Sequence, residues 1–224
     1  MQVTNSLDYT YEQGRDIGKD VQIIALSTCG FCKRALRFLR ENNIAFRFIY
    51  FDDLDRDVKS QVREEVRETF DIGLAFPYLI IDRKEAHSGF NEEKWRAYLE
   101  LDKTEKKPAH KAEGEEPDEL DTEYKFVENT ARYKGWELLA NEQFLRDLVE
   151  GLHKNRERYG YYLCPCREGT GDRKADTDIV CPCDYAAPDI QEYGHCYCAL
   201  YQSPEFKKSG KTPSSIPERR NKSK

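Results

Sequence analysis

Six of the chain's eight cysteines lie close together, and this cluster constrains the fold more than any other feature of the sequence. They form three Cys-x-Cys pairs, Cys164/Cys166, Cys181/Cys183 and Cys196/Cys198. Proline lies inside the first two pairs, and the other two cysteines, Cys29 and Cys32, lie in the stretch STCGFC. Structural disulfides, a zinc site and an iron–sulfur cluster all use clustered cysteines, so other features must distinguish among them.

The composition favours metal or redox chemistry over structural disulfides. The 224 residues are 38% hydrophobic and 35% charged, and the net charge of −6 gives no case for a nucleic-acid-binding protein. No apolar run approaches the roughly 20 residues of a membrane-spanning helix. The polar N-terminus is unlike a secretory signal peptide. We therefore expect a cytoplasmic protein with no nucleic-acid or membrane partner, where persistent disulfides are rare.

Residues 21–101 alternate between strand and helix patterns. VQIIALS, AFRFIYF and FPYLIID are typical of strands, while CKRALRFLRENN has helical spacing. In LDRDVKSQVREEVRETF, Val58, Val62 and Val66 recur at i, i+4 and i+8, which predicts an amphipathic helix. NEEKWRAYLEL predicts a closing helix with Asn91 as its N-cap and Trp95 in the core. This order predicts a small layered α/β domain.

The rest of the chain reads as a linker, a helical region with the cysteine pairs, and a tail. Residues 102–119 are rich in Lys, Glu, Pro and Gly, which predicts a flexible linker with a reach of about 25 Å. Two or three helices should follow, with Trp136 in the core. One has an apolar face of Phe144, Leu148 and Leu152, and Gly160 should end the last helix.

We therefore expect four segments along the chain. They are a domain over residues 1–101, a linker over 102–119, a second domain over 120–203 and a basic disordered tail over 204–224. The tail has seven Lys or Arg against two Glu. Such a tail either keeps the protein soluble, which we favour, or steers an acidic partner toward it.

The Cys-x-x-Cys pair lies where a predicted strand meets a predicted helix. Cys29 should lie at the helix N-terminus, where unpaired N–H groups, the helix dipole and nearby Lys33 favour its thiolate. Cys32 can then resolve a mixed disulfide. The alternatives are half of a zinc site or two inert core cysteines.

STCGFCKRA, followed by FPYLIID and SGF, resembles a glutaredoxin or glutaredoxin-like redoxin of the thioredoxin fold, over roughly residues 20–101. The resemblance implies a cis Phe76–Pro77 peptide bond, with Pro77 facing the thiol pair and binding a partner's extended backbone. The SGF at Ser88 to Phe90 resembles redoxins that protein partners reduce. The double-glycine and acidic pattern of glutathione users is not evident.

The chemistry of the six clustered cysteines favours a [4Fe–4S] cluster but leaves alternatives open. Such a cluster needs four thiolates, and the two remaining thiols can form one disulfide. Zinc also accepts four thiolates, although structural zinc sites usually use Cys-x₂₋₄-Cys spacing. Structural disulfides are the third possibility.

The order CPC, CPC and Cys-x-Cys after LVEGLHKNRERYGYY resembles the catalytic subunit of ferredoxin:thioredoxin reductase, over about residues 120–203. The resemblance implies a mainly α domain that binds a [4Fe–4S] cluster. The implied ligands are Cys164, Cys181, Cys183 and Cys196. It also implies a redox-active disulfide between Cys166, the exposed thiol that attacks a partner, and Cys198 beside the cluster.

The sequence departs from this family inside the third pair. The family usually has histidine there, near the cluster and the disulfide, whereas this chain has Tyr197 and a histidine one position earlier, His195. His195 is a candidate proton carrier, and the alternative is a structural or surface imidazole. The stretch DYAAPDIQEYGH reads as a long loop between the second and third pairs.

Together these resemblances predict an oxidoreductase, a ferredoxin-dependent disulfide reductase. Electrons would pass through the cluster and the Cys166–Cys198 disulfide to the Cys29–Cys32 pair. From there they would reach thioredoxin-type, glutaredoxin-type or other protein disulfides. One alternative is a zinc- or cluster-stabilised scaffold that carries a redoxin as an adaptor. The other is an iron–sulfur carrier, although the dithiol pattern with Cys32 is unlike such carriers.

Overall fold

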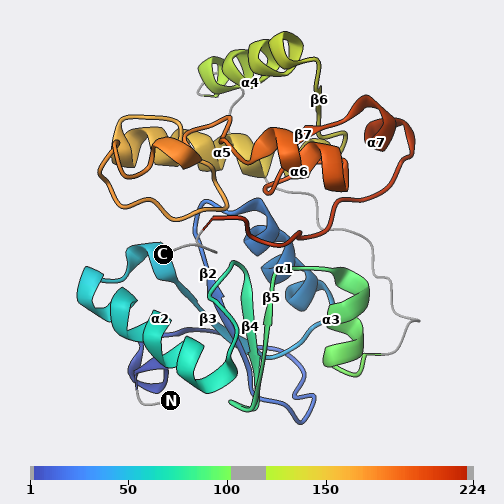
Figure 1. Cartoon of the computed structure of the whole chain (residues 1–224). Coiled ribbons are helices and arrows are strands. Elements are labelled where there is room, and N and C mark those ends of the chain that lie inside the picture. Colours follow the sequence, from blue (N-terminus) through green and yellow to red (C-terminus); the bar gives the residue numbers. More distant parts are fainter. Residues whose placement is uncertain (1–2, 102–119, 221–224) are drawn as a thin grey trace. The chain divides into compact units, whose positions relative to one another are not determined.

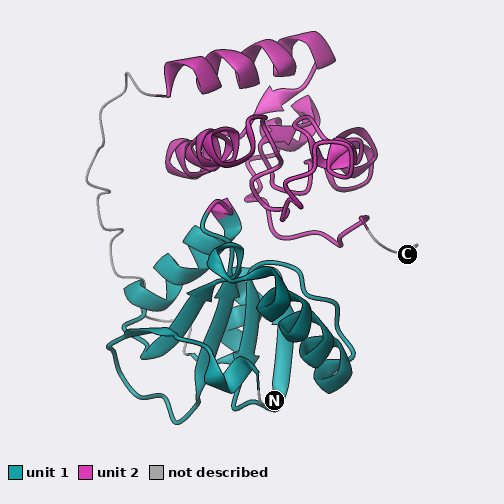
Figure 2. Ribbon diagram, turned by 90° about the vertical axis from the view of Figure 1, so that its left-hand side faces the viewer, with its two compact units in different colours: residues 1–27, 31–110 teal, residues 28–30, 111–224 magenta. Residues whose placement is uncertain are grey.

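The computed structural model describes residues 3–101 and 120–220 (Figure 1). The predicted linker over 102–119 lies outside the described residues. Contacts divide the chain into two units, coloured separately in Figure 2. Residues 1–27 and 31–110 belong to the first, and residues 28–30 and 111–224 to the second. No helix in the described part of the chain is long and apolar enough to cross a membrane.

The first unit contains a five-stranded mixed sheet with the order β1-β3-β2-β4-β5. Its strands are β1 (Thr10–Glu12), β2 (Val21–Ala25), β3 (Phe46–Tyr50), β4 (Tyr78–Ile81) and β5 (Glu85–Ser88). β2 is parallel to β3 and antiparallel to β4, and the two outer pairings are antiparallel. Every residue of β2 is buried, as expected for an apolar run in the centre of a sheet.

Helices cover both faces of this sheet. They are α1 (Gly30–Glu41), α2 (Arg56–Phe70) and α3 (Glu92–Tyr98), with 3₁₀ turns η1 (Thr4–Ser6) and η2 (Phe51–Asp53). In Figure 1, α2 lies on one side of the strands and α1 and α3 on the other. The Phe38 ring of α1 lies 6.4 Å from that of Trp95 in α3, whereas Phe70 of α2 faces Tyr78 of β4 at 6.4 Å. The arrangement is the predicted layered α/β fold.

Most local predictions for the first unit are confirmed. Val62 and Val66 are buried, while Val58 at the start of that face is only partly covered. Asn91 caps α3, and its side chain accepts the Lys94 N–H at 3.0 Å. Strand β1 was not predicted, because its sequence TYE has no alternating apolar pattern. It is held by pairing with the edge of β3 instead.

The second unit is mainly helical. Its elements are α4 (Asp121–Lys134), β6 (Glu137–Leu138), α5 (Glu142–Tyr159), η3 (Thr177–Ile179), α6 (Ala186–Tyr193), β7 (Tyr201–Gln202) and α7 (Pro204–Lys208). The two short strands pair antiparallel. On α5, Phe144, Leu148 and Leu152 are at most 2% exposed, which confirms the predicted apolar face. Gly160 ends α5 with a φ of 80°.

Two predictions for this unit are wrong. The stretch between the second and third cysteine pairs is not the predicted loop, because it contains α6, which is capped at its C-terminus by Gly194. Trp136 is only partly buried, although its ring packs on Tyr201 at 5.4 Å. Trp95 in the first unit is 1% exposed, as predicted.

The expectation of a disordered tail is wrong for residues 204–220. Ser203 caps α7 by accepting the Phe206 N–H at 3.1 Å. Further along, Arg219 forms an ion pair with the buried Asp189 at 2.5 Å, and Arg220 lies 3.0 Å from a carboxylate oxygen of Asp178. Arg219 and Arg220, two of the basic residues that indicated disorder, therefore have carboxylate partners within the same unit.

Candidate functional site

Backbone pairing brings the first two cysteine pairs together. An isolated antiparallel bridge joins Leu163 and Val180, the residues directly before Cys164 and Cys181. The Cys164 N–H donates to the Ile179 carbonyl at 2.9 Å. Leu163 and Ile179 are both fully buried, so the bridge lies in an apolar environment.

The third pair lies in a tight turn that leads into β7. The Ala199 N–H donates to the Cys196 carbonyl at 2.8 Å, and Ala199 has a positive φ of 68°. The Cys196 N–H donates to the Tyr201 carbonyl at 2.9 Å, and the Tyr201 N–H points at the Cys196 sulfur at 3.4 Å. The turn therefore fixes the orientation of the Cys196 sulfur.

The sulfurs of the three pairs form one contact network. The Sγ atoms of Cys196 and Cys198 are 3.7 Å apart. Hydrogen bonds from the Cys183 and Cys198 thiols hold the pKa of Cys164 well below its usual value. Burial raises the pKa of Cys181, whose sulfur lies 3.9 Å from the Tyr201 hydroxyl.

A buried arginine lies beside this network. Arg167 is 4% exposed, and its Nη1 lies 3.1 Å from the Cys183 sulfur and 3.8 Å from the Cys164 sulfur. Its Nε and Nη2 donate to Glu218 at 2.8 to 3.1 Å. The guanidinium also lies 4.2 Å from the ring centroid of Tyr197, the residue inside the third pair.

The donor set fits a [4Fe–4S] cluster. Among residues 3–101 and 120–220, no three His, Cys, Asp or Glu side chains are arranged around a single metal ion. A [4Fe–4S] cluster uses four separate thiolates around a larger group. Four soft sulfur donors in a buried network, with a buried guanidinium beside two of them, match the ligand type and the negative charge of such a cluster.

Side chains from neighbouring segments hold the first pair in place. Asn155 of α5 donates to the Leu163 carbonyl at 3.0 Å. Asp176 is fully buried and accepts the Thr170 N–H at 2.9 Å and the Tyr161 hydroxyl at 2.8 Å. Burial and the hydrogen bond to Asp176 raise the pKa of Tyr161 to about 12. These contacts order the segment between the first and second pairs.

The predicted redox thiols of this unit lie beside the first and third cysteine pairs' other sulfurs. Cys198 is 3% exposed. The expected exposure of Cys166 stays a prediction. The Cys166 N–H hydrogen-bonds the Cys164 sulfur. The pairing of Cys166 with Cys198 stays a prediction.

His195 contacts the backbone of the third pair. Its Nδ1 lies 2.9 Å from the Cys196 carbonyl oxygen, and its ring packs edge-on against Phe206. Burial lowers the pKa of His195. In the described part of the chain, neither of its ring nitrogens hydrogen-bonds a cysteine sulfur. The proton-carrying role of His195 stays a prediction.

The Cys-x-x-Cys pair lies where the sequence predicted. Cys29 directly precedes α1, and Cys32 lies in its first turn, with its sulfur accepting the Leu26 N–H at 3.4 Å. Ser27, at the end of the preceding segment, is held by Asp52 through its N–H at 2.8 Å and its hydroxyl at 2.5 Å. The Phe76–Pro77 peptide bond is cis, which confirms the prediction.

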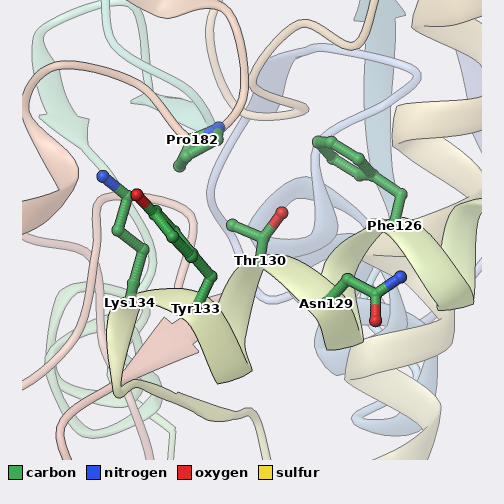
Figure 3. Close-up of a pocket in the computed structure, with 6 residues that line it drawn as sticks. All are labelled: Phe126, Asn129, Thr130, Tyr133, Lys134 and Pro182. Atoms are coloured by element: carbon green, nitrogen blue, oxygen red, sulfur yellow. The ribbon is translucent and has the colours of Figure 1, made fainter.

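A surface groove adjoins the second cysteine pair (Figure 3). It has a volume of about 350 Å³, and five of its lining residues come from α4. Pro182, which lies between Cys181 and Cys183, faces them from the other side of the groove. Tyr133 on its rim is 86% exposed.

Comparison with known proteins identifies relatives of both halves. A family model described as the ferredoxin thioredoxin reductase catalytic beta chain matches residues 113–220, and a glutaredoxin model matches residues 21–85. The ferredoxin-thioredoxin reductase catalytic chain of Porphyra purpurea is 32% identical over 91 residues, which cover 39% of this chain and 73% of that protein. The chain belongs to the ferredoxin-thioredoxin reductase catalytic chain family.

Two further relatives extend the comparison. The chloroplastic catalytic chain of ferredoxin-thioredoxin reductase from Arabidopsis thaliana is 31% identical over 101 residues, covering 43% of this chain and 66% of that protein. The solved glutaredoxin of Methanosarcina mazei Go1 is 33% identical, with a TM-score of 0.37, and covers 41% of this chain and 86% of its own. The reductase family and the glutaredoxin model together make the chain a disulfide oxidoreductase with a thioredoxin-fold N-terminal domain.

The structure shows three functional candidates that the sequence analysis did not identify, Arg167, Glu218 and Asp176. Arg167 directly follows the first cysteine pair, so its proximity to the sulfurs could have been suspected from that position. Glu218 lies in the stretch predicted to be disordered, and nothing in its local pattern indicates an active-site contact. Asp176 lies in a polar stretch that reads as an ordinary loop.

Proposed function

We propose that the chain is a ferredoxin-dependent disulfide reductase that binds a [4Fe–4S] cluster. The proposed ligands are Cys164, Cys181, Cys183 and Cys196. The observation that carries the proposal is the buried network of sulfur contacts within the residues that match the reductase family. The proposed electron donor is a ferredoxin, and the proposed acceptors are protein disulfides of the thioredoxin or glutaredoxin type.

The bound cluster would supply one-electron storage, which a disulfide lacks, so that a one-electron donor can complete a two-electron reduction. The cysteine side chains carry out the remaining steps. Two electrons and two protons convert the Cys166–Cys198 disulfide into two thiols. The Cys166 thiolate then attacks the Cys29 sulfur of an oxidised Cys29–Cys32 pair, which forms a mixed disulfide and releases the Cys32 thiolate.

The second exchange completes the transfer. The Cys198 thiolate attacks Cys166, which releases the Cys29 thiolate and re-forms the Cys166–Cys198 disulfide. The reduced Cys29–Cys32 pair is then available to a protein disulfide.

The direction of electron flow follows from typical reduction potentials. The reduction potentials of glutaredoxins are about −200 to −230 mV, and those of plant-type ferredoxins are about −400 mV. A difference of roughly 180 mV over two electrons corresponds to about 8 kcal/mol, at about 30 mV for each 1.4 kcal/mol. Electrons should therefore pass from ferredoxin to the thiols.

The exchange step is tested by trapping the mixed disulfide in the full chain. The double variant C32S/C198S lacks both resolving thiols, so a small-molecule disulfide oxidant should cross-link Cys29 to Cys166. The matched variant C29S/C198S keeps Cys32 and should not cross-link through it. Peptide mapping identifies the linked pair. An uncross-linked C32S/C198S protein, or equal cross-linking in both variants, contradicts the proposed relay.

A further inference from the structure

Arg167 places a positive charge against two of the proposed ligand sulfurs. Its Nη1 donates toward Cys183 at 3.1 Å and lies 3.8 Å from Cys164. The Arg167 side chain is 2% exposed, so water screens this charge very little. A buried charge needs partners, and one of those partners is the sulfur network itself.

Glu218 is the second partner, and it comes from a distant part of the chain. It lies 51 residues after Arg167 and accepts three hydrogen bonds from the guanidinium, between 2.8 and 3.1 Å. Such a two-pronged contact fixes the plane of the guanidinium as well as its position. The Tyr197 and Tyr185 rings lie 4.2 and 4.9 Å from it and restrict it further.

The neighbours of Glu218 hold this end of the chain to the same unit. Arg219 pairs with Asp189, which is fully buried, and Arg220 lies 3.6 Å from the buried Asp176. Three consecutive residues therefore meet three buried side chains of opposite charge. The carboxylate of Glu218 is thus held in register with Arg167.

We propose that the Arg167–Glu218 pair sets the reduction potential of the group held by Cys164 and Cys183. Arg167 supplies positive charge beside the ligand sulfurs, and Glu218 is a positioning residue that fixes this charge and offsets part of it. The inference rests on the proposed function, because it presupposes a cluster at these cysteines. Reduction adds negative charge to the cluster, so a nearby positive charge favours the reduced state and raises the potential.

The two members of the pair have opposite charges, so removing one or the other should shift the midpoint potential in opposite directions. R167Q removes the positive charge and should lower the ratio of reduced to oxidised cluster about tenfold at a fixed potential. For a one-electron couple that is a midpoint about 59 mV more negative. E218Q removes the offsetting negative charge while keeping an acceptor oxygen, so its midpoint should move by a smaller amount in the positive direction.

The experiment is a redox titration of the anaerobically prepared full chain, followed by electron paramagnetic resonance, with iron content measured on each sample. R167K keeps the charge and covers the case in which R167Q does not fold, and its midpoint should lie between wild type and R167Q. E137Q is the matched control, because Glu137 forms an exposed ion pair with Lys207 at 2.9 Å. Its midpoint should equal that of wild type.

The outcomes separate the two proposals. Opposite shifts in R167Q and E218Q, with iron content retained, support the inference. An unchanged midpoint in R167Q, or a shift of E218Q in the same direction as R167Q, overturns the inference about the reduction potential. It does not affect the proposal that a cluster is bound. Wild-type protein without an iron–sulfur cluster overturns the proposed function itself.

Discussion

Replacing Asp176 with asparagine should loosen the segment that brings the first two cysteine pairs together. Asp176 is 0% exposed and accepts hydrogen bonds from the Thr170 N–H and hydroxyl, the Gly171 N–H and the Tyr161 hydroxyl, at 2.8 to 3.2 Å. Asparagine has almost the same shape, but one of its two terminal groups is an NH₂ donor. Both carboxylate oxygens of Asp176 accept hydrogen bonds, so the asparagine NH₂ group faces N–H or O–H donors in either orientation.

The size of the effect follows from the contacts that are lost. A hydrogen bond to a charged group contributes about 1.5–3 kcal/mol, so the loss of about two such bonds gives a cost of about 3–6 kcal/mol. The damage should reach the site because Ile179, which accepts the Cys164 N–H, follows Asp176 within the same short segment. The amides of Cys164 and Cys181 should therefore lose protection.

Hydrogen exchange measured by mass spectrometry on peptides from residues 161–181 tests this directly. D184N is the matched control, because Asp184 is exposed and takes no part in the hydrogen bonds to the Asp176 carboxylate. D176N should exchange much faster than wild type and should bind less iron, whereas D184N should stay close to wild type. Equal protection in D176N and D184N refutes the reasoning.

Two further predictions concern stability, and both are measured by chemical denaturation of the full chain. The buried Glu123 accepts from Arg156 at 2.9 Å, and although burial alone raises the pKa of Glu123, this hydrogen bond brings it below its ordinary value of 4.5. Its stabilisation is therefore present above pH 4.5 and is lost as the pH falls through the folded-state pKa, so E123Q should be about 1–3 kcal/mol less stable than wild type at pH 7. The difference in unfolding free energy between wild type and E123Q should shrink as the pH falls through the folded-state pKa. A difference that is constant with pH contradicts the lowered pKa of Glu123. G194A and G135A both place alanine at positive φ, which should lower the stability by about 1–2 kcal/mol in each variant. Only at Gly194 does the new methyl group overlap the Phe206 ring, which should lower the stability by a further amount of about 1–3 kcal/mol, the typical cost of overpacking. Equal losses in the two glycine variants would show that the Phe206 contact has no energetic weight.

The parts of the fold that the sequence predicted are those with a local physical cause. The buried strand β2 follows from a continuous apolar run, and the face of α5 follows from the spacing of Phe144, Leu148 and Leu152. The position of Cys29 and Cys32 at the start of α1 follows from the junction of a strand pattern with a helix pattern.

The parts that the sequence did not predict depend on distant partners. Strand β1 has no apolar alternation and forms because β3 offers an unpaired edge. The stretch 204–220 has a disorder-like composition, yet its arginines meet buried carboxylates that a local pattern cannot reveal. Glu218 meets Arg167 across 51 residues of sequence, so no window of ordinary length contains both.

The most direct test of the account is the iron and acid-labile sulfide content of the full chain, purified without oxygen. Wild type and C166S should each contain about four iron and about four sulfide atoms per chain, because Cys166 is not a proposed ligand. C183S should lose most of both. Wild-type protein that contains zinc or no metal, or a C183S variant with the full iron content, would contradict the central claim.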